Sequence, residues 1–215
     1  MGKLIIFDLD GTLLNTIADL GKACNFALEL NGLPQHPLEE YNKMVGGGAR
    51  SLIQNAAPGV FETRLEAILH DFRRYYDTHC RNLTCPYPGI PELIDDLLAG
   101  KCTLAVCSNK YQRATEKIID YYFPGVFAAV YGEREGISRK PAPDALLAIM
   151  KKLGFKPEDT VMVGDSDVDV EAARNAGIAS IAVTWGFQPE FQLRAARPDH
   201  LVNSPDEILR LLKGA

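Results

Sequence analysis

The stretch Leu4-Ile-Ile-Phe-Asp-Leu-Asp-Gly-Thr12 decides the fold. Its first four residues form an unbroken apolar run, which is typical of a strand buried on both faces of a parallel sheet. Side chains alternate along an extended chain, so Asp8 and Asp10 point to the same side beyond that strand. Gly11 then allows the backbone to turn sharply. Two carboxylates therefore stand at the carboxyl end of a buried strand, where open α/β sheets bind ligands.

The closeness of these two carboxylates has chemical consequences. Like charges at short range are unfavourable unless a cation lies between them or one group is protonated. A metal ion would keep Asp8 ionised as a nucleophile, and a shifted pKa would leave Asp10 protonated as an acid. An Asp-rich turn after an ordinary strand is the plain alternative, since short motifs also occur by chance. The rest of the chain decides between them.

Composition and charge limit the class of protein. The chain has 215 residues, 47% of them apolar, which is enough for a core domain with a smaller insert. The formal net charge is −5, so we expect no nucleic-acid partner. The five cysteines are irregularly spaced and predict no disulfide framework. No apolar stretch is long enough to span a membrane and no signal-peptide pattern is found, so we expect a cytoplasmic protein without a membrane partner.

The pattern along the chain predicts two domains. Residues 38–83 show helical periodicity without a strand-like run, so we interpret residues 15–84 as an inserted, small, all-helical domain. Strands and helices alternate after it, which predicts an α/β core with a doubly wound parallel sheet, made of residues 1–14 and 85–215. The expected strands are residues 4–7, 103–107, 128–131, 160–163, 179–184 and 200–202. The expected helices are residues 17–30, 38–45, 49–56, 61–79, 90–98, 113–122, 143–153, 168–176 and 206–212.

Polar side chains follow three of the apolar runs. Asp8 follows the first, Ser108 the second and Asp165 the third, with Asp169 shortly beyond. Because the carboxyl ends of parallel strands share one edge of the sheet, we expect these side chains to lie together. Lys140 comes from the loop between the second and third of these strands. All of these groups are therefore expected at one site.

This set of groups suits phosphate chemistry. Asp8, Asp165 and Asp169 offer the hard oxygen ligands that Mg²⁺ prefers. Ser108 offers a hydroxyl to a phosphate oxygen, and Lys140 adds a positive charge that offsets the carboxylates. Positioning a phosphoryl group and neutralising its charge is the main task of phosphoryl-transfer enzymes. The combination therefore indicates phosphoryl transfer with Mg²⁺ as the cofactor.

Each of these groups taken alone has a simpler explanation. A serine after a strand is an ordinary helix cap, and a single lysine is usually solvated. Clustered aspartates from Asp165 onward could form a Ca²⁺ loop, but such a loop needs glycine at its sixth position and glutamate at its twelfth. Those positions hold Val170 and Ala176. The order and strand-end placement of the whole set favour the functional interpretation.

With these motifs the chain resembles the haloacid dehalogenase (HAD) superfamily of aspartate-nucleophile phosphotransferases. Asp8-Leu-Asp10-Gly-Thr12, Ser108, Lys140 and the segment 164–169 occur in the order of that family. The helical insert resembles the family's small cap domain on a Rossmann-like core. Two further stretches, residues 44–53 and Ser108-Asn109-Lys110, resemble the phosphoglycolate phosphatases within the family.

The resemblance implies a mechanism. Asp8 is expected to attack phosphorus and form an aspartyl-phosphate, while Asp10 protonates the leaving oxygen and later activates water. The expected metal ligands are Asp8, the backbone carbonyl of Asp10, and Asp165, with support from Asp169. Ser108 and Lys140 are expected to bind the transferring phosphoryl group.

Substrate recognition follows less directly. Thr12 and Asn109 are expected to contact the substrate beside the core motifs. Arg50 follows three glycines and would suit a substrate carboxylate or second phosphate, although an exposed helix arginine is the simpler interpretation. Many relatives have aspartate where this chain has Asn15. We expect a small phosphorylated metabolite as substrate, 2-phosphoglycolate first, and a monomer or a homodimer.

Several other functions use the same core. A pyrophosphatase, a nucleotide or sugar phosphatase, and a β-phosphoglucomutase remain open, although Thr12 favours hydrolysis over the mutase. Asp10 favours phosphate chemistry over dehalogenation. A catalytically inactive phosphate-binding protein or a receiver-like signalling protein is the alternative from another class. The presence of both Asp8 and Asp10, and the insert after the first strand, argue against it.

Overall fold

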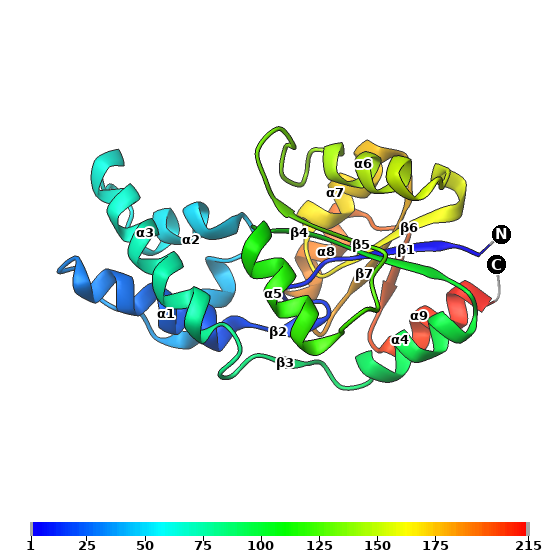
Figure 1. Cartoon of the computed structure of the whole chain (residues 1–215), viewed down its shortest axis with the longest axis horizontal. Coiled ribbons are helices and arrows are strands. Elements are labelled where there is room, and N and C mark those ends of the chain that lie inside the picture. Colours follow the sequence, from blue (N-terminus) through cyan, green and yellow to red (C-terminus); the bar gives the residue numbers. More distant parts are fainter. Residues whose placement is uncertain (1, 214–215) are drawn as a thin grey trace. The chain divides into compact units, whose positions relative to one another are not determined.

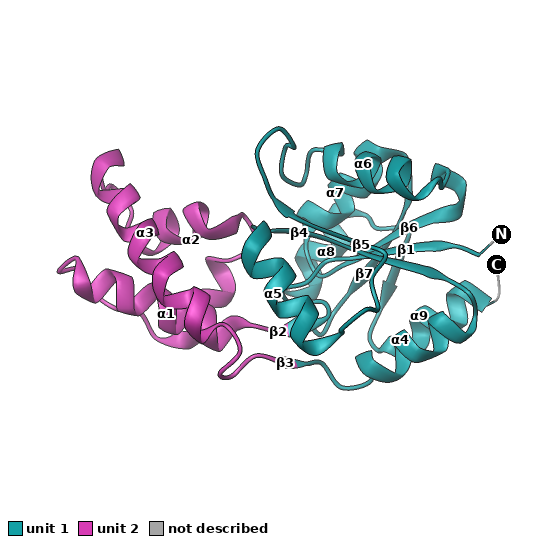
Figure 2. Ribbon diagram, in the orientation of Figure 1, with its two compact units in different colours: residues 1–14, 86–215 teal, residues 15–85 magenta. Residues whose placement is uncertain are grey.

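The computed structural model describes residues 2–213 and divides into two compact units (Figures 1 and 2). Unit 1 consists of residues 1–14 and 86–215, and unit 2 of residues 15–85. The border that we expected after residue 84 differs from this by one residue. No helix within residues 2–213 combines the length and the apolar character needed to cross a membrane.

Unit 1 is built on a parallel sheet of six strands in the order β5-β4-β1-β6-β7-β8. The chain moves outward from β1 through β4 and β5, then returns and moves outward on the other side from β6 to β8. The strand order therefore reverses between β1 and β6, which makes this the topological switch point. The predicted doubly wound sheet is confirmed. The strands are β1 (Leu4–Phe7), β4 (Thr103–Tyr111), β5 (Ala129–Glu133), β6 (Thr160–Gly164), β7 (Ala179–Val183) and β8 (His200–Val202).

Helices cover both faces of this sheet (Figure 1). Leu4 and Ile6 of β1 share a core cluster with residues of α6 and α7, on one face. Ile5 and Phe7 alternate with them and are also fully buried, while α4, α5 and α9 lie on the opposite face. Burial on both faces explains the unbroken apolar run of β1. The helices are α4 (Ile90–Ala99), α5 (Gln112–Tyr122), α6 (Asp144–Leu153), the 3₁₀ turn η2 (Pro157–Asp159), α7 (Asp167–Ala176), α8 (Glu190–Ala196) and α9 (Pro205–Lys213).

The register of the central strands aligns their carboxyl ends. Phe7 is paired with Val106 of β4 on one side and with Val163 of β6 on the other. The N–H of Asp8 continues the ladder by donating to the carbonyl of Val163 at 2.9 Å. The first residues beyond these pairs therefore lie at one level of the sheet edge.

Two expectations about elements of unit 1 were wrong. β4 does not end before Ser108 but continues to Tyr111, with an irregular register between Cys107 and Tyr111. The segment after Cys107 is polar but buried, and burial obliges its backbone groups to find partners, so pairing resumes at Tyr111. Helix α8 was not expected, because seven residues are too few to display a helical period.

Unit 2 is helical, as its periodicity predicts. Its elements are α1 (Ile17–Leu30), the 3₁₀ helix η1 (Leu38–Lys43), α2 (Gly48–Ala56) and α3 (Glu62–His79). The helix expected at residues 38–45 is the 3₁₀ helix. Pro37 before it and Gly46 after it leave a segment too short for a stable α-helix, and short segments often adopt 3₁₀ turns. The short strands β2 (Leu14–Asn15) and β3 (Cys85–Pro86) form a two-stranded sheet.

A buried carboxylate joins the first helix of unit 2 to its last segment. Asp19, in the first turn of α1, is 2% exposed. It accepts hydrogen bonds from the N–H of Leu83 at 3.0 Å, and from the N–H and hydroxyl of Thr84, both at 2.9 Å. The carboxylate thus accepts hydrogen bonds from three donors in the last segment of unit 2.

We predict that Asp19→Asn lowers the free energy of unfolding by about 1–3 kcal/mol, since one acceptor of this buried group becomes a donor facing donors. Denaturant unfolding followed by circular dichroism measures the change. Glu29→Gln makes the same chemical change at an exposed position of the same helix and should have little effect. Equal effects of the two substitutions would contradict the structural role of Asp19.

Candidate active site

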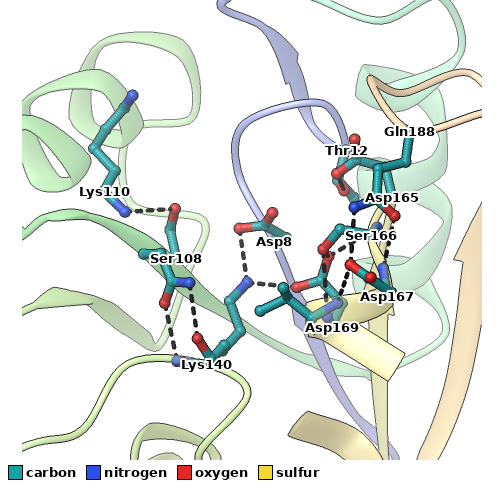
Figure 3. A network of polar contacts seen from close by, with 12 residues as sticks. Asp8, Thr12, Ser108, Lys110, Lys140, Asp165, Ser166, Asp167, Asp169 and Gln188 are labelled. Carbon is teal, nitrogen blue, oxygen red and sulfur yellow. Dashed lines mark hydrogen bonds and ion pairs between the residues drawn. The ribbon is translucent and has the colours of Figure 1, made fainter. Parts of the chain in front are cut away.

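The three aspartates predicted as metal ligands come together at the switch point (Figure 3). Asp8 follows β1, Asp165 follows β6, and Asp169 lies in the first turn of α7. Each offers a carboxylate oxygen, and these oxygens lie within 4.8 Å of one another. All three residues are buried. Such a cluster is able to ligate a divalent cation.

Lys140 lies between two of these carboxylates (Figure 3). Its Nζ is 3.0 Å from Oδ1 of Asp8 and 2.5 Å from Oδ1 of Asp169. Its main chain is held by the side chain of Asn109, whose Nδ2 donates to the Lys140 carbonyl at 3.0 Å and whose Oδ1 accepts from the Lys140 N–H at 2.9 Å. Asn109 of β4 therefore holds the main chain of Lys140, while Asp8 and Asp169 hold its ammonium group.

Asp169 is oriented by the start of its own helix. Ser166 and Asp169 form a capping box, in which the Asp169 N–H donates to Ser166 Oγ at 3.3 Å and Asp169 Oδ2 accepts from the Ser166 N–H at 3.1 Å. The Ser166 hydroxyl also donates to Oδ2 at 2.6 Å. A Cβ on Gly164 would stand 2.3 Å from Cγ of Asp169, so only glycine fits there.

The electrostatics of this cluster are unbalanced. Burial raises the pKa of Asp8 to about 7, against the lowering effect of Lys140 and with further increases from the charges of Asp169 and Asp10. Burial, and then the charges of Asp8 and Asp169, raise the pKa of Asp165 well above its usual value. Burial alone would lower the pKa of Lys140, but the charges of Asp169 and Asp8 outweigh it and raise that pKa. One lysine thus faces three buried carboxylates.

A bound divalent cation would correct this imbalance. Oδ1 of Asp8 is buried, and among the described residues it has the ion pair with Lys140 but no well-directed hydrogen bond. A buried, incompletely satisfied carboxylate oxygen beside two further carboxylates is a suitable ligand for Mg²⁺. The residues present therefore fit the cofactor that the sequence predicts.

Asp10 has surroundings different from those of the triad. Its side chain is 19% exposed, and Oδ2 lies 2.8 Å from Nζ of Lys110, whose side chain is 3% exposed. The two aspartates of the first motif therefore pair with different lysines, Asp8 with Lys140 and Asp10 with Lys110, although their side chains are similarly exposed, at 12% and 19%. Lys110 is not among the site residues that the sequence predicts, although it belongs to the stretch Ser108-Asn109-Lys110.

The other predicted phosphate and substrate contacts are buried beside the cluster. Ser108 Oγ accepts from the N–H of Lys110 at 3.3 Å. The hydroxyl of Thr12 donates to Oδ1 of Asp165 at 3.1 Å. Together with Asn109, which holds Lys140, these side chains have structural partners within the core. Their contact with a substrate stays a prediction.

Arg50 belongs to unit 2 and is not part of this cluster. Its guanidinium forms ion pairs with Glu62, at 2.7 Å, and with Glu66 on α3. The structure therefore gives Arg50 an alternative role as a tie between α2 and α3. Its contact with a substrate also stays a prediction.

The sequence does not predict one segment that contacts this cluster. The loop after β7, residues 184–189, contacts both the first motif and the acidic motif. Trp185 Nε1 donates to the carbonyl of Thr12 at 3.1 Å, and the N–H of Phe187 donates to Oδ2 of Asp165 at 2.7 Å. The signal was available, because the strand expected at residues 179–184 ends at the same sheet edge as the others.

Comparison with known proteins agrees with this geometry. The chain matches the haloacid dehalogenase-like hydrolases over residues 5–183. A phosphoglycolate phosphatase of Aquifex aeolicus is 32% identical over 211 residues, which cover 98% of this chain and 96% of that protein. A phosphoglycolate phosphatase of Agrobacterium fabrum is 37% identical over 193 residues, which cover 87% of this chain and 82% of that protein. A crystal structure from Lactobacillus delbrueckii subsp. bulgaricus, 33% identical, superposes with a TM-score of 0.91 and covers 98% of both chains.

These matches extend over the sheet, the helical insert and every core motif from Asp8 to Asp169. They confirm the resemblance that the motifs indicate. The chain therefore belongs to the haloacid dehalogenase-like hydrolase family, in the part of it that resembles the phosphoglycolate phosphatases.

Proposed function

We propose that this protein is a Mg²⁺-dependent phosphomonoester hydrolase that works through an aspartyl-phosphate on Asp8. The observation that carries the proposal is the buried cluster of Asp8, Asp165 and Asp169, in which Lys140 contacts Asp8 and Asp169 and Asp10 lies two residues beyond Asp8. The relatives named phosphoglycolate phosphatase support 2-phosphoglycolate as the first substrate to test.

The proposed cation ligands are Asp8, Asp165 and the backbone carbonyl of Asp10, with Asp169 as a direct or supporting ligand. When bound, Mg²⁺ would offset the charge of these carboxylates and of the phosphoryl oxygens. The positive charge of Lys140 stabilises the same carboxylates, because its Nζ contacts both Asp8 and Asp169.

Asp8 is proposed as the nucleophile. Its contact with Lys140 favours the ionised carboxylate that attack requires, against the effect of burial. A carboxylate oxygen of Asp8 forms a bond to phosphorus while the bond from phosphorus to the ester oxygen breaks. The departing oxygen takes the bonding electron pair and needs a proton.

Asp10 is proposed to supply that proton. It would donate the proton as the carboxylic acid, and the carboxylate left behind would then pair with Lys110, whose Nζ lies 2.8 Å from Oδ2. In the second step water attacks phosphorus, Asp10 accepts the proton, and the bond to Asp8 breaks to release phosphate. The aspartate that protonates the first leaving group is thus ready to act as the base.

The phosphoryl group is proposed to bind to the Lys140 ammonium and the Ser108 hydroxyl, with Thr12 and Asn109 adjoining. Asn109 contributes at least by holding Lys140, as its two hydrogen bonds indicate. Unit 2 is proposed as the cap that excludes water and reads the rest of the substrate. Within this unit, Arg50 would bind a carboxylate of the substrate in place of its ion pair with Glu62 or Glu66.

The proposed function is tested by measuring phosphate release from a panel of compounds, with Mg²⁺ and with a chelator. The panel holds 2-phosphoglycolate, sugar phosphates, nucleotides, pyrophosphate and an aryl phosphate. We expect Mg²⁺-dependent hydrolysis with the highest kcat/KM for 2-phosphoglycolate. Preference for another compound would replace the substrate and keep the mechanism. Absence of release from every compound would contradict hydrolysis itself.

We predict that Asp8→Asn lowers kcat by at least about 10³-fold while the protein stays folded, because an amide is a poor nucleophile. Phosphate release and far-UV circular dichroism measure the two effects. Asp120→Asn makes the same change on an exposed face of α5 and should leave kcat unchanged. Substantial turnover by Asp8→Asn would exclude Asp8 as the nucleophile.

The raised pKa of Asp8 predicts how stability depends on pH. Between about pH 4 and about pH 7 the folded metal-free protein binds more protons at Asp8 than the unfolded chain does. Its free energy of unfolding should therefore fall, by a few kcal/mol, as pH rises through this range.

Mg²⁺ should reverse this loss, because its ligands bind in their deprotonated forms. We expect Mg²⁺ to raise Tm more at pH 8 than at pH 5, and calorimetric scans at the two pH values measure the difference. Asp165→Asn should abolish most of the increase. An equal Tm shift at both pH values would show that the cation binds elsewhere.

A further inference from the structure

Two glycines from separate segments approach the side chain of Asp165 closely. A Cβ built on Gly11 would stand 2.2 Å from its Oδ2, and a Cβ built on Gly186 would stand 2.2 Å from its Cβ and 2.4 Å from Oδ2. Both distances are far below van der Waals contact. Asp165 therefore packs against two backbone segments, at positions where neither segment has room for a side chain.

These two segments also bind the carboxylate directly. On the side of the first motif, the Thr12 hydroxyl donates to Oδ1 at 3.1 Å. On the side of the loop after β7, the N–H of Phe187 donates to Oδ2 at 2.7 Å. Each oxygen thus has one donor, and the two donors, from different segments of the chain, fix the orientation of the carboxylate.

The loop itself is anchored at both ends of residues 185–188. Trp185 donates its indole N–H to the carbonyl of Thr12 at 3.1 Å. Gln188 accepts from the N–H of Asp167 at 2.9 Å and donates to Oδ1 of Asp167 at 2.8 Å (Figure 3). The loop is therefore attached both to the first motif and to the start of α7, the two segments that carry the carboxylates.

Mg²⁺ demands nearly ideal octahedral ligand positions, so the orientation of each carboxylate governs affinity. We propose that the loop of residues 185–188 is a positioning element for the cation site, and that Gly186 is the residue that allows its main chain to reach Asp165. This inference rests on the proposed function, since it concerns the cation that the cluster would hold. In this role the loop affects the affinity for the cation and takes no part in the chemical step.

The test is Gly186→Ala, because Gly186 does not have a left-handed backbone conformation and the three atoms nearest to the new methyl group all belong to Asp165. We expect the Kd for Mg²⁺, measured by titration calorimetry, to rise about 10- to 100-fold, as for the loss of other groups that orient metal ligands. At saturating Mg²⁺, kcat should return to within about threefold of the native value, because the loop contacts neither Asp8 nor Asp10 in the hydrogen bonds described. Rescue by added cation distinguishes positioning from general damage to the fold.

A spectroscopic signal tests the same inference independently of activity. Trp185 is the sole tryptophan of the chain, so its fluorescence reports on this loop alone. Addition of Mg²⁺ should change the emission of the native protein, and the midpoint should move to higher Mg²⁺ concentration in Gly186→Ala. Gly100→Ala, which adds a methyl group at an exposed helix end remote from the sheet edge, is the matched control.

The outcomes separate this inference from the proposed function. If the native protein binds and requires Mg²⁺ but Gly186→Ala has the same Kd, the inference is overturned. If the native protein neither binds Mg²⁺ nor releases phosphate, the proposed function fails. Should Gly186→Ala not fold, Gln188→Ala replaces it, with Gln192→Ala as control. An Mg²⁺ affinity equal to that of the control would again overturn the inference.

Discussion

Burial of three carboxylates against a single lysine is the constraint on which the organisation of unit 1 depends. Charges removed from water are costly unless paired, and here the pairing is incomplete. The fold tolerates this because the groups lie at the carboxyl ends of β1 and β6. These two strands are central in the sheet and are buried on both faces. A rigid, apolar sheet thus holds polar groups in positions that they would not adopt unaided.

The neighbours of these carboxylates are arranged to keep them in place. Asp169 is held by the capping box with Ser166, Lys140 by the side chain of Asn109, and Asp165 by Thr12 and the Phe187 N–H. At Gly11, Gly164 and Gly186 an added Cβ would stand 2.2 to 2.3 Å from an atom of Asp165 or Asp169, so each of these approaches requires glycine. Much of the site's geometry is therefore fixed by main-chain atoms and by groups that do not themselves react.

The sequence was sufficient to predict the sheet and the groups at its edge, because both depend on local signals. An unbroken apolar run followed by Asp8 predicts a buried strand with a carboxylate at its end, and the same holds for Asp165. The partners were not predictable in this way. Lys110 contacts Asp10 only because β4 continues past Cys107, and Phe187 contacts Asp165 through its N–H, which is the same in every residue except proline. Arg50 was singled out by its sequence neighbours, whereas its ion partners on α3 depend on tertiary packing.

The discontinuity of unit 1 has a consequence for synthesis of the chain. β1 leaves the ribosome well before its two neighbours in the sheet, β4 and β6, which begin at Thr103 and Thr160. Residues 15–85 are complete before either neighbour exists, so the helical unit has the opportunity to fold first. Until then the apolar first strand exposes two unpaired edges, the kind of surface on which chains aggregate. A nascent chain of this architecture is therefore most exposed to misassembly in the interval before β4 and β6 are synthesised, and chaperone capture of β1 during that interval would protect the strand that precedes Asp8.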